Sequence, residues 1–97
     1  MRIKVLDVEI DPEARTVERS GRPLRLTPRE LALLSLFARH ANQVVTRDQI
    51  RQELYTDGAG RASNLVDVYV RYLRRKLGTP TILHTRRGRG YVFGADT

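Results

Sequence analysis

The sequence predicts an α+β domain: a small antiparallel sheet, then three helices, then a C-terminal β-hairpin. Apolar and polar residues alternate as far as about residue 26, which is the period of a β-strand. The period then changes to the spacing of amphipathic helices as far as Leu77, and alternation returns in the arginine-rich stretch that follows. With 97 residues, 40% of them hydrophobic, the chain is expected to form one domain around one core over residues 1–97.

The sheet is expected over residues 2–26, as three or four short antiparallel strands. Two turn-forming stretches divide it, Asp11-Pro12-Glu13 and Ser20-Gly21-Arg22-Pro23, because proline presets φ and glycine permits a positive φ. The apolar residues that follow the strand period are Ile3, Val5, Val8, Ile10, Val17, Leu24 and Leu26. This pattern favours a scaffolding role for the sheet.

Two helices are predicted by a repeated capping box. In Thr27-Pro28-Arg29-Glu30 a threonine caps free N–H groups, proline takes the first helical position and glutamate closes the box. We expect this helix at about residues 28–41, with Asn42 ending it in a left-handed conformation. Thr46-Arg47-Asp48-Gln49 predicts a second helix at about 47–55, after a short extended link at Val44-Val45. The buried stripe of the first helix is expected to be Leu31, Leu34, Phe37 and Ala38.

A third amphipathic helix is predicted at about residues 63–77, after a glycine-containing loop at 56–62 and before the stop at Gly78-Thr79-Pro80. Its apolar stripe follows the i, i+4, i+7, i+11 spacing: Val66, Val70, Leu73 and Leu77. The opposite side carries Asn64, Val68, Arg71 and Arg75, with Asp67, Tyr72 and Arg74 on its flanks. A helix about 22 Å long and ~10–12 Å wide fits the major groove of DNA, although a basic face is also typical of a solvated surface helix.

A hairpin is predicted at about residues 81–94, with β-prone runs on either side of an arginine-glycine tip. Arg86, Arg87 and Arg89 stand at this tip. A cationic finger of this kind suits a narrow, electronegative minor groove. The alternative is a charged edge that prevents strands of neighbouring molecules from pairing.

Basic charge is concentrated in the last third of the chain. Residues 1–30 carry seven basic and six acidic side chains, whereas residues 61–97 carry eight and two, or +6 of the total +7. Such a segment favours an anionic partner, either nucleic acid or a membrane surface. We disfavour the membrane because the third helix needs its apolar face for the core.

Several classes of protein have little support in the sequence. The chain has no cysteine, and its two histidines, His40 and His84, lie far apart. We see neither a phosphate-binding glycine loop nor a nucleophile with a nearby base, so we expect no enzyme, no catalytic residue, no metal and no cofactor. The sequence contains no apolar run of about 18 residues and no secretory signal, so a cytoplasmic protein is expected.

The order of the elements is that of a winged helix-turn-helix, and four motifs resemble the DNA-binding effector domain of OmpR/PhoB-type response regulators. The motifs are Leu26–Glu30, Val45–Ile50, Val66–Leu77 and the wing residues Thr85, Arg87-Gly88 and Gly90-Tyr91. Tyr55, Tyr72 and Arg86 depart from the residues usual in that family. The resemblance spans nearly the whole chain. It implies sequence-specific binding of double-stranded DNA by a transcription regulator of two-component type.

By this resemblance and the helix wheel, the third helix would enter the major groove and the wing the minor groove. The base-reading residues would be Asn64, Val68, Tyr72 and Arg75. Arg87 and Arg89 would enter the minor groove. The phosphate-binding residues would be Thr46, Arg47, Tyr55, Arg71, Arg74, Thr85 and Arg86. Asp67 and Arg71, one turn apart, are expected to form an intrahelical ion pair.

The resemblance also implies partners other than DNA. In activators of this family the loop at 56–62, with Asp57, Gly58 and Arg61, can contact RNA polymerase. A second copy is expected on a neighbouring half-site, because one helix and one wing touch few base pairs. No receiver domain is legible, so we expect either part of a longer regulator or a stand-alone one. The alternative function is a non-catalytic interaction module whose basic face docks an acidic protein.

Overall fold

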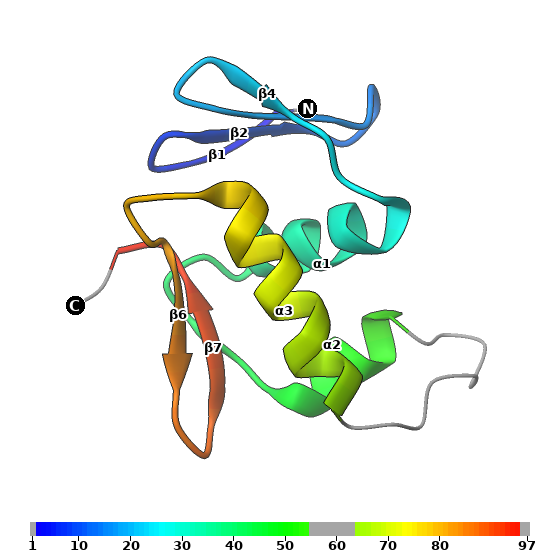
Figure 1. Ribbon diagram of the computed structural model, residues 1–97, viewed down its shortest axis with the longest axis vertical. Helices are drawn as coiled ribbons and strands as arrows, with labels where there is room; N and C mark the ends of the chain where they lie inside the picture. The colour runs from blue at the N-terminus through cyan, green and yellow to red at the C-terminus, as the bar shows by residue number, and fades with distance from the viewer. Residues whose placement is uncertain (1, 55–63, 96–97) are drawn as a thin grey trace.

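The computed structural model describes residues 2–54 and 64–95 as two antiparallel sheets joined by three helices (Figure 1). The N-terminal sheet lies across the top of Figure 1, the helices lie below it, and a hairpin projects at the bottom left. The elements are β1 (Ile3–Val5), β2 (Val8–Asp11), β3 (Thr16–Arg19), β4 (Arg22–Leu24), α1 (Pro28–Arg39), β5 (Val44–Val45), α2 (Arg47–Leu54), α3 (Asn64–Leu77), β6 (Leu83–Arg86) and β7 (Gly90–Phe93). The predicted α+β winged-helix architecture is confirmed.

The N-terminal sheet is built from neighbouring strands in the order β1-β2-β3-β4, all antiparallel. Ser20 and Gly21 have φ values of 52° and 80° between β3 and β4. A two-residue hairpin turn with both φ values positive matches the twist of the strands it joins. Ile10 and Val17 face each other across β2 and β3 and are 1% and 4% exposed. The period-two pattern therefore placed the core face of this sheet correctly.

Helix α1 begins as predicted and ends earlier than predicted. The Oγ1 atom of Thr27 accepts from the backbone N–H of Glu30 at 3.2 Å, and the Glu30 carboxylate accepts from the N–H of Thr27 at 2.9 Å. The helix ends at Arg39 rather than near 41, because the His40 N–H bonds back to the Phe37 carbonyl at 3.1 Å and Asn42 takes a φ of 66°.

The buried face of α1 is wider than the predicted stripe. Leu33 and Leu36 are buried along with Leu34, Phe37 and Ala38, whereas Leu31 is only partly covered. Both the N-terminal sheet and the other two helices pack on α1, so one stripe is too narrow to serve them all.

Helices α2 and α3 start and stop close to the predicted residues. Thr46 and Gln49 form the expected reciprocal cap on α2, with N–H to side-chain distances of 2.8 and 3.2 Å. Helix α3 ends where Gly78 adopts a φ of 77°. The predicted apolar stripe of α3 is buried: Val66, Val70, Leu73 and Leu77 are at most 2% exposed.

The predicted hairpin belongs to a three-stranded sheet of order β5-β7-β6. The expected extended link at Val44-Val45 is strand β5, in which Val45 pairs with Tyr91 of β7. At Gly90, where φ is 144°, an added Cβ atom would lie 2.1 Å from the Val45 carbonyl oxygen. Only glycine allows this approach, which ties the hairpin to the segment between α1 and α2.

None of the helices in the described part of the chain has the length and hydrophobicity needed to cross a lipid bilayer.

Candidate nucleic-acid interface

The exposed face of α3 lies opposite its buried stripe and carries four of the side chains proposed to contact DNA. Arg71 and Arg75 are exposed, Val68 is half-buried and Tyr72 is 42% exposed. The rings of Tyr69 and Tyr72 pack edge to face, with centroids 6.4 Å apart, which supports the Tyr72 ring. This face therefore offers an apolar contact, a phenol and two guanidinium groups side by side.

An aspartate holds the start of α3 against two other elements. The Asp67 carboxylate accepts hydrogen bonds from Nη1 of Arg47, on α2, and from the hydroxyl of Tyr91, on β7. The bond from Arg47, followed by that from Tyr91, holds the pKa of Asp67 below its usual value. Burial and the same carboxylate raise the pKa of the Tyr91 hydroxyl, so it remains a donor at neutral pH. The network fixes α2, α3 and the wing relative to one another.

The expected ion pair between Asp67 and Arg71 is wrong. Among the described residues, the ion pair of Asp67 is with Arg47, and Arg71 acts on the carboxylate only as a more distant charge. The start of α2 packs beside the start of α3, so Arg47 reaches the carboxylate that helical spacing alone assigned to Arg71. Arg71 thus keeps its exposed position on the outer face.

A second link joins the last turn of α3 to the wing. Nε of Arg74 donates to the Leu83 carbonyl at 2.9 Å, and Nη2 donates to Oγ1 of Thr85 at 3.1 Å. Arg74 and Thr85 were each expected at a phosphate, and the structure brings them together across α3 and β6. A phosphate bound there would meet a guanidinium already held in place by the wing.

The wing tip presents its arginines beside the N-terminus of α2. The Arg89 N–H closes the tip on the Arg86 carbonyl at 2.9 Å, and Gly88 has a φ of 75°. Arg87 and Arg89 are exposed, and Arg86 is half-buried. A groove runs between the two elements, lined by Thr46, Arg47, Asp48, Arg51, Thr85, Arg86, Arg87, Gly88, Arg89, Gly90 and Tyr91.

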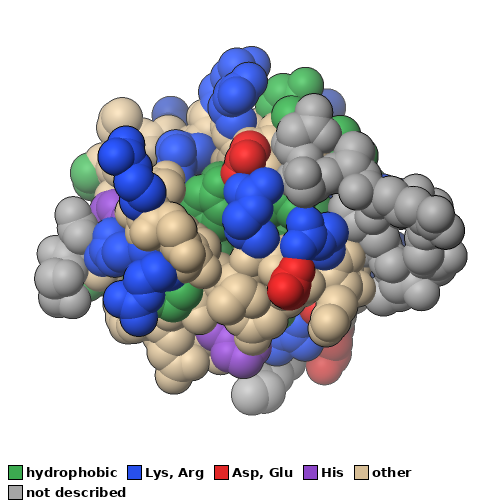
Figure 2. Space-filling view, turned by 90° about the horizontal axis from the view of Figure 1, so that it is seen from below, with side chains coloured by type: hydrophobic (Ala, Val, Ile, Leu, Met, Phe, Trp, Pro, Cys, Tyr) green, Lys and Arg blue, Asp and Glu red, His purple; other side chains and the backbone are tan. Residues whose placement is uncertain are grey.

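Basic side chains collect on this side of the molecule. Figure 2 views it from below, along the projecting wing, and shows basic side chains (blue) over the wing and the adjoining helices, with few carboxylates among them. The N–H groups at the start of α2 add a partial positive charge to the same groove. The combination is an anion-binding surface on which the α3 face and the wing tip lie next to each other.

Sequence reasoning missed two buried charged residues that support α3. Arg19 of β3 is 3% exposed, and Glu30 of α1 is 4% exposed and accepts from Nζ of Lys76 at 2.7 Å. Burial raises the pKa of Glu30, but the bonds from Lys76 and Thr27 outweigh it, so the pKa lies below its usual value. The available signal for Arg19 was its position two residues after Val17, on the inward face of the strand period.

Some predicted positions lie outside the described residues. These are Tyr55, Asp57, Gly58, Arg61 and the side chain of Asn64, whose backbone opens α3. Within residues 2–54 and 64–95, no three histidine or acidic side chains are grouped so as to hold a metal ion.

Residues 21–93 match the family described as "Transcriptional regulatory protein, C terminal". The chain therefore belongs to this family, whose members are OmpR/PhoB-type transcription regulators. It is 44% identical over 88 residues to the transcriptional regulatory protein QseB of Escherichia coli O157:H7, covering 91% of this chain and 40% of QseB. The chain spans about two fifths of the length of the curated relatives it matches.

Solved structures of similar domains include two in complex with DNA. The DNA-binding domain of Klebsiella pneumoniae RstA, crystallised with the RstA box, superposes with a TM-score of 0.83 at 31% identity over 96% of each chain. The DNA-binding domain of the response regulator AdeR, in complex with an intercistronic region, gives 0.85 at 27% identity over 97% of this chain and 99% of the other.

Proposed function

We propose that this domain binds double-stranded DNA sequence-specifically, as the effector part of a two-component transcription regulator. The observation that carries the proposal is that the exposed face of α3 and the arginine tip of the wing lie on one basic surface (Figure 2). A helix and a projecting hairpin so arranged suit the major groove and the adjacent minor groove. The complexes of the similar RstA and AdeR domains with DNA support it.

Each exposed group has a role that follows from its chemistry. Val68 suits the methyl group of thymine, and Tyr72 and Arg75 suit base edges, with Asn64 at the start of the same helix. Arg87 and Arg89 suit the minor groove, whose negative potential attracts guanidinium groups. The proposed phosphate contacts are Thr46, Arg47, Tyr55, Arg71, Arg74, Thr85 and Arg86.

Three further features belong to the proposal. A second copy would bind a neighbouring half-site, because the reading surface of one copy is small. The loop at 56–62 would contact RNA polymerase if the regulator is an activator. A chromosomal target would place the protein in the cytoplasm. Footprinting that found one protected half-site at saturation would contradict the binding of a second copy to a neighbouring half-site.

The test separates base reading from phosphate binding. Duplexes selected from a random pool define the preferred site, and the affinity of each variant is then measured on that site, on single-base changes of it and on random DNA. Val68→Ala and Tyr72→Ala should each change the preference by about 1–3 kcal/mol at particular base pairs. Arg71→Ala should weaken all duplexes similarly and reduce the salt slope by roughly one.

Two outcomes would contradict the proposal. If Val68→Ala and Tyr72→Ala lowered affinity equally on every duplex, α3 would not read bases. If the slope of log K against log salt for the parent domain were near zero, phosphates would not be the anions that the basic surface binds.

A further inference from the structure

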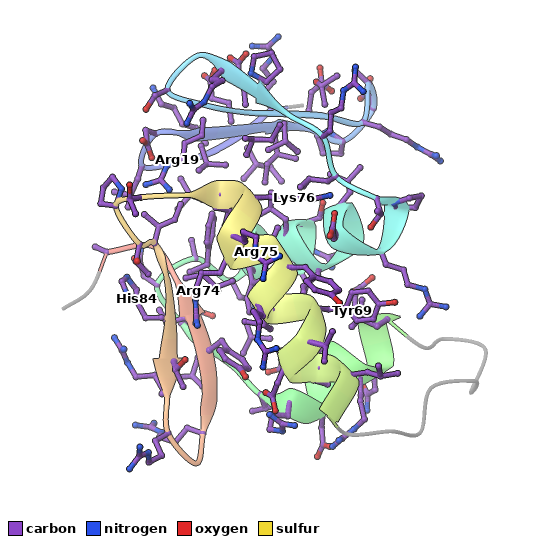
Figure 3. The ribbon with its side chains drawn as sticks, in the orientation of Figure 1. Arg19, Tyr69, Arg74, Arg75, Lys76 and His84 are labelled. Atoms are coloured by element: carbon purple, nitrogen blue, oxygen red, sulfur yellow. The ribbon has the colours of Figure 1, made fainter. Side chains whose placement is uncertain are left out.

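Arg19 is a buried arginine on the far side of the molecule from the basic surface. It lies on β3, above the end of α3 (Figure 3), and is 3% exposed. A buried guanidinium has five N–H donors, and each one left unpaired would be costly. The partners of Arg19 therefore indicate what it holds in place.

Most of these partners are backbone carbonyls at the end of α3 and just after it. Nη1 donates to the carbonyls of Leu77 and Gly78 at 2.9 and 3.1 Å, and Nη2 donates to that of Pro80. The last carbonyls of a helix have no partner within the helix and carry its negative dipole end. Arg19 satisfies that of Leu77 and, with the same guanidinium group, holds the connector between α3 and β6.

A carboxylate fixes the guanidinium from its other side. Nε of Arg19 lies 3.2 Å from both carboxylate oxygens of Asp7. The Oγ of Ser20 donates to the same carboxylate at 2.7 Å, and its N–H donates to the Asp7 carbonyl at 2.8 Å. The arginine is thus anchored in the N-terminal sheet and reaches across to the connector.

We infer that Arg19 is a positioning residue for DNA recognition, which sets the angle between α3 and the wing. The inference rests on the proposed function. Two links join α3 to the wing directly: the Asp67–Tyr91 bond near the start of the helix, and the bonds of Arg74 in its last turn. Arg19 adds a third link, which ties the connector between α3 and β6 to the N-terminal sheet. With all three links the wing stays where it can enter the minor groove while α3 occupies the major groove.

The test asks whether the contribution of the wing depends on Arg19. Affinities for the selected duplex and for random DNA are measured for the parent, Arg87→Ala, Arg19→Gln and the double variant. Arg19→Gln should lower affinity for the selected duplex by about 5- to 10-fold. The factor by which Arg87→Ala lowers affinity, here called the Arg87→Ala penalty, should be smaller by a similar factor when Arg19 is already replaced. On random DNA the loss caused by Arg87→Ala should shrink in the same way, because the wing contact depends little on base sequence.

Two controls separate positioning from folding and from charge. Arg22→Gln removes the same charge from the exposed residue paired with Arg19 in register, and should leave the Arg87→Ala penalty intact. Arg19→Lys keeps the charge but not the planar fork, and should restore the penalty in part. If circular dichroism finds Arg19→Gln unfolded, Asp7→Asn takes its place and should shrink the penalty by a smaller factor.

The possible failures differ from one another. A folded Arg19→Gln or Asp7→Asn variant that left the Arg87→Ala penalty unchanged would overturn this inference but not the proposed function. The same holds if Arg22→Gln reduced the penalty as much as Arg19→Gln does. If Arg19→Gln only reduced the fraction of folded protein, affinity for the selected duplex and for random DNA would fall by the same factor, and the loss caused by Arg87→Ala would not change. That result would also overturn the inference about Arg19. A parent domain without preference for the selected duplex would overturn the proposed function and this inference with it.

Discussion

The two sheets of this domain use similar backbones for different purposes. Both are small and antiparallel, and each has a glycine-containing turn flanked by arginine: Gly21 beside Arg22, and Gly88 between Arg87 and Arg89. In the N-terminal sheet, Glu9 stands between Lys4 and Glu18 across the strands, so charges of both signs are interspersed. In the wing the charged residues are all arginines.

This difference shows that charge distribution, and not sheet architecture, separates a scaffold from a binding element. The buried arginine of the N-terminal sheet, Arg19, points inward and satisfies carbonyls of its own chain. The arginines of the wing tip, Arg87 and Arg89, point to solvent beside the N-terminus of α2. An anion approaching the molecule therefore meets concentrated positive charge at the wing and a mixture of charges at the other sheet.

The largest expected effect comes from separating β7 from β5 in the three-stranded sheet β5-β7-β6, here called the wing sheet. Gly90→Ala would place a Cβ atom 2.1 Å from the Val45 carbonyl oxygen, at a φ of 144°. We expect a loss of about 3 kcal/mol or more in the free energy of unfolding, measured with urea. The matched control is Gly88→Ala at the wing tip, where φ is 75° and nothing lies within 4 Å, and which should cost about 1–2 kcal/mol. Equal losses would contradict the role given to the Gly90–Val45 approach.

Removing the charge of Asp67, which is bonded to the wing, should affect stability differently from removing the charge of Glu9 in the N-terminal sheet. Asp67→Asn weakens the bonds to Arg47 and Tyr91 and should cost about 1–2 kcal/mol of unfolding free energy at pH 7. Glu9→Gln should be close to neutral, because it removes the attraction to Lys4 and the repulsion from Glu18 together.

The Asp67→Asn loss should also depend on pH. The pKa of Asp67 is lower in the folded than in the unfolded chain, so its contribution is present above the unfolded value and disappears as pH falls through the folded value. Urea unfolding of parent and variant at pH 7 and near pH 3 checks this. A difference that grew on acidification would contradict the assigned partners.

The arginines at the two turns should differ in DNA binding. Arg87→Ala should weaken binding by about tenfold on most duplexes with little change of base preference, because the minor groove distinguishes little beyond A·T from G·C. Arg22→Ala removes a charge from the other sheet that is also exposed, and should change affinity by less than about twofold. Fluorescence anisotropy at several salt concentrations measures both. Equal losses would mean that net charge, and not its placement, governs binding.

The smallest effect concerns the first turn of the N-terminal sheet. Leu6 has a φ of 53° and is 53% exposed, an unusual position for a leucine. Leu6→Asn should stabilise the domain by about 0.5–1 kcal/mol, because asparagine tolerates this conformation better. Val8→Asn in the adjacent strand is the opposite control, since Val8 is fully buried and its replacement should destabilise strongly. A lower urea midpoint for Leu6→Asn would contradict the prediction.

The features predicted from sequence were those decided within a few residues. The caps at Thr27–Glu30 and Thr46–Gln49 and the stripe from Val66 to Leu77 all follow from local spacing. The pairing of β5 with β7 and the Arg47–Asp67 pair were missed, because they join residues that packing alone brings together. Among the proposed site residues, the exposed positions of Arg71, Arg75 and Arg87 followed from the helix wheel and the hairpin tip.

The pairing of β5 with β7 also bears on the order in which the chain acquires its structure. The four N-terminal strands join neighbours through short turns, so each pairing closes a short loop at little cost in chain entropy and can form early in folding. The wing sheet needs Val45 to meet Tyr91, which closes a long loop that contains α2 and α3. Its completion therefore belongs to the final cooperative step of folding, and its amide hydrogens should exchange with solvent only when the helices open as well.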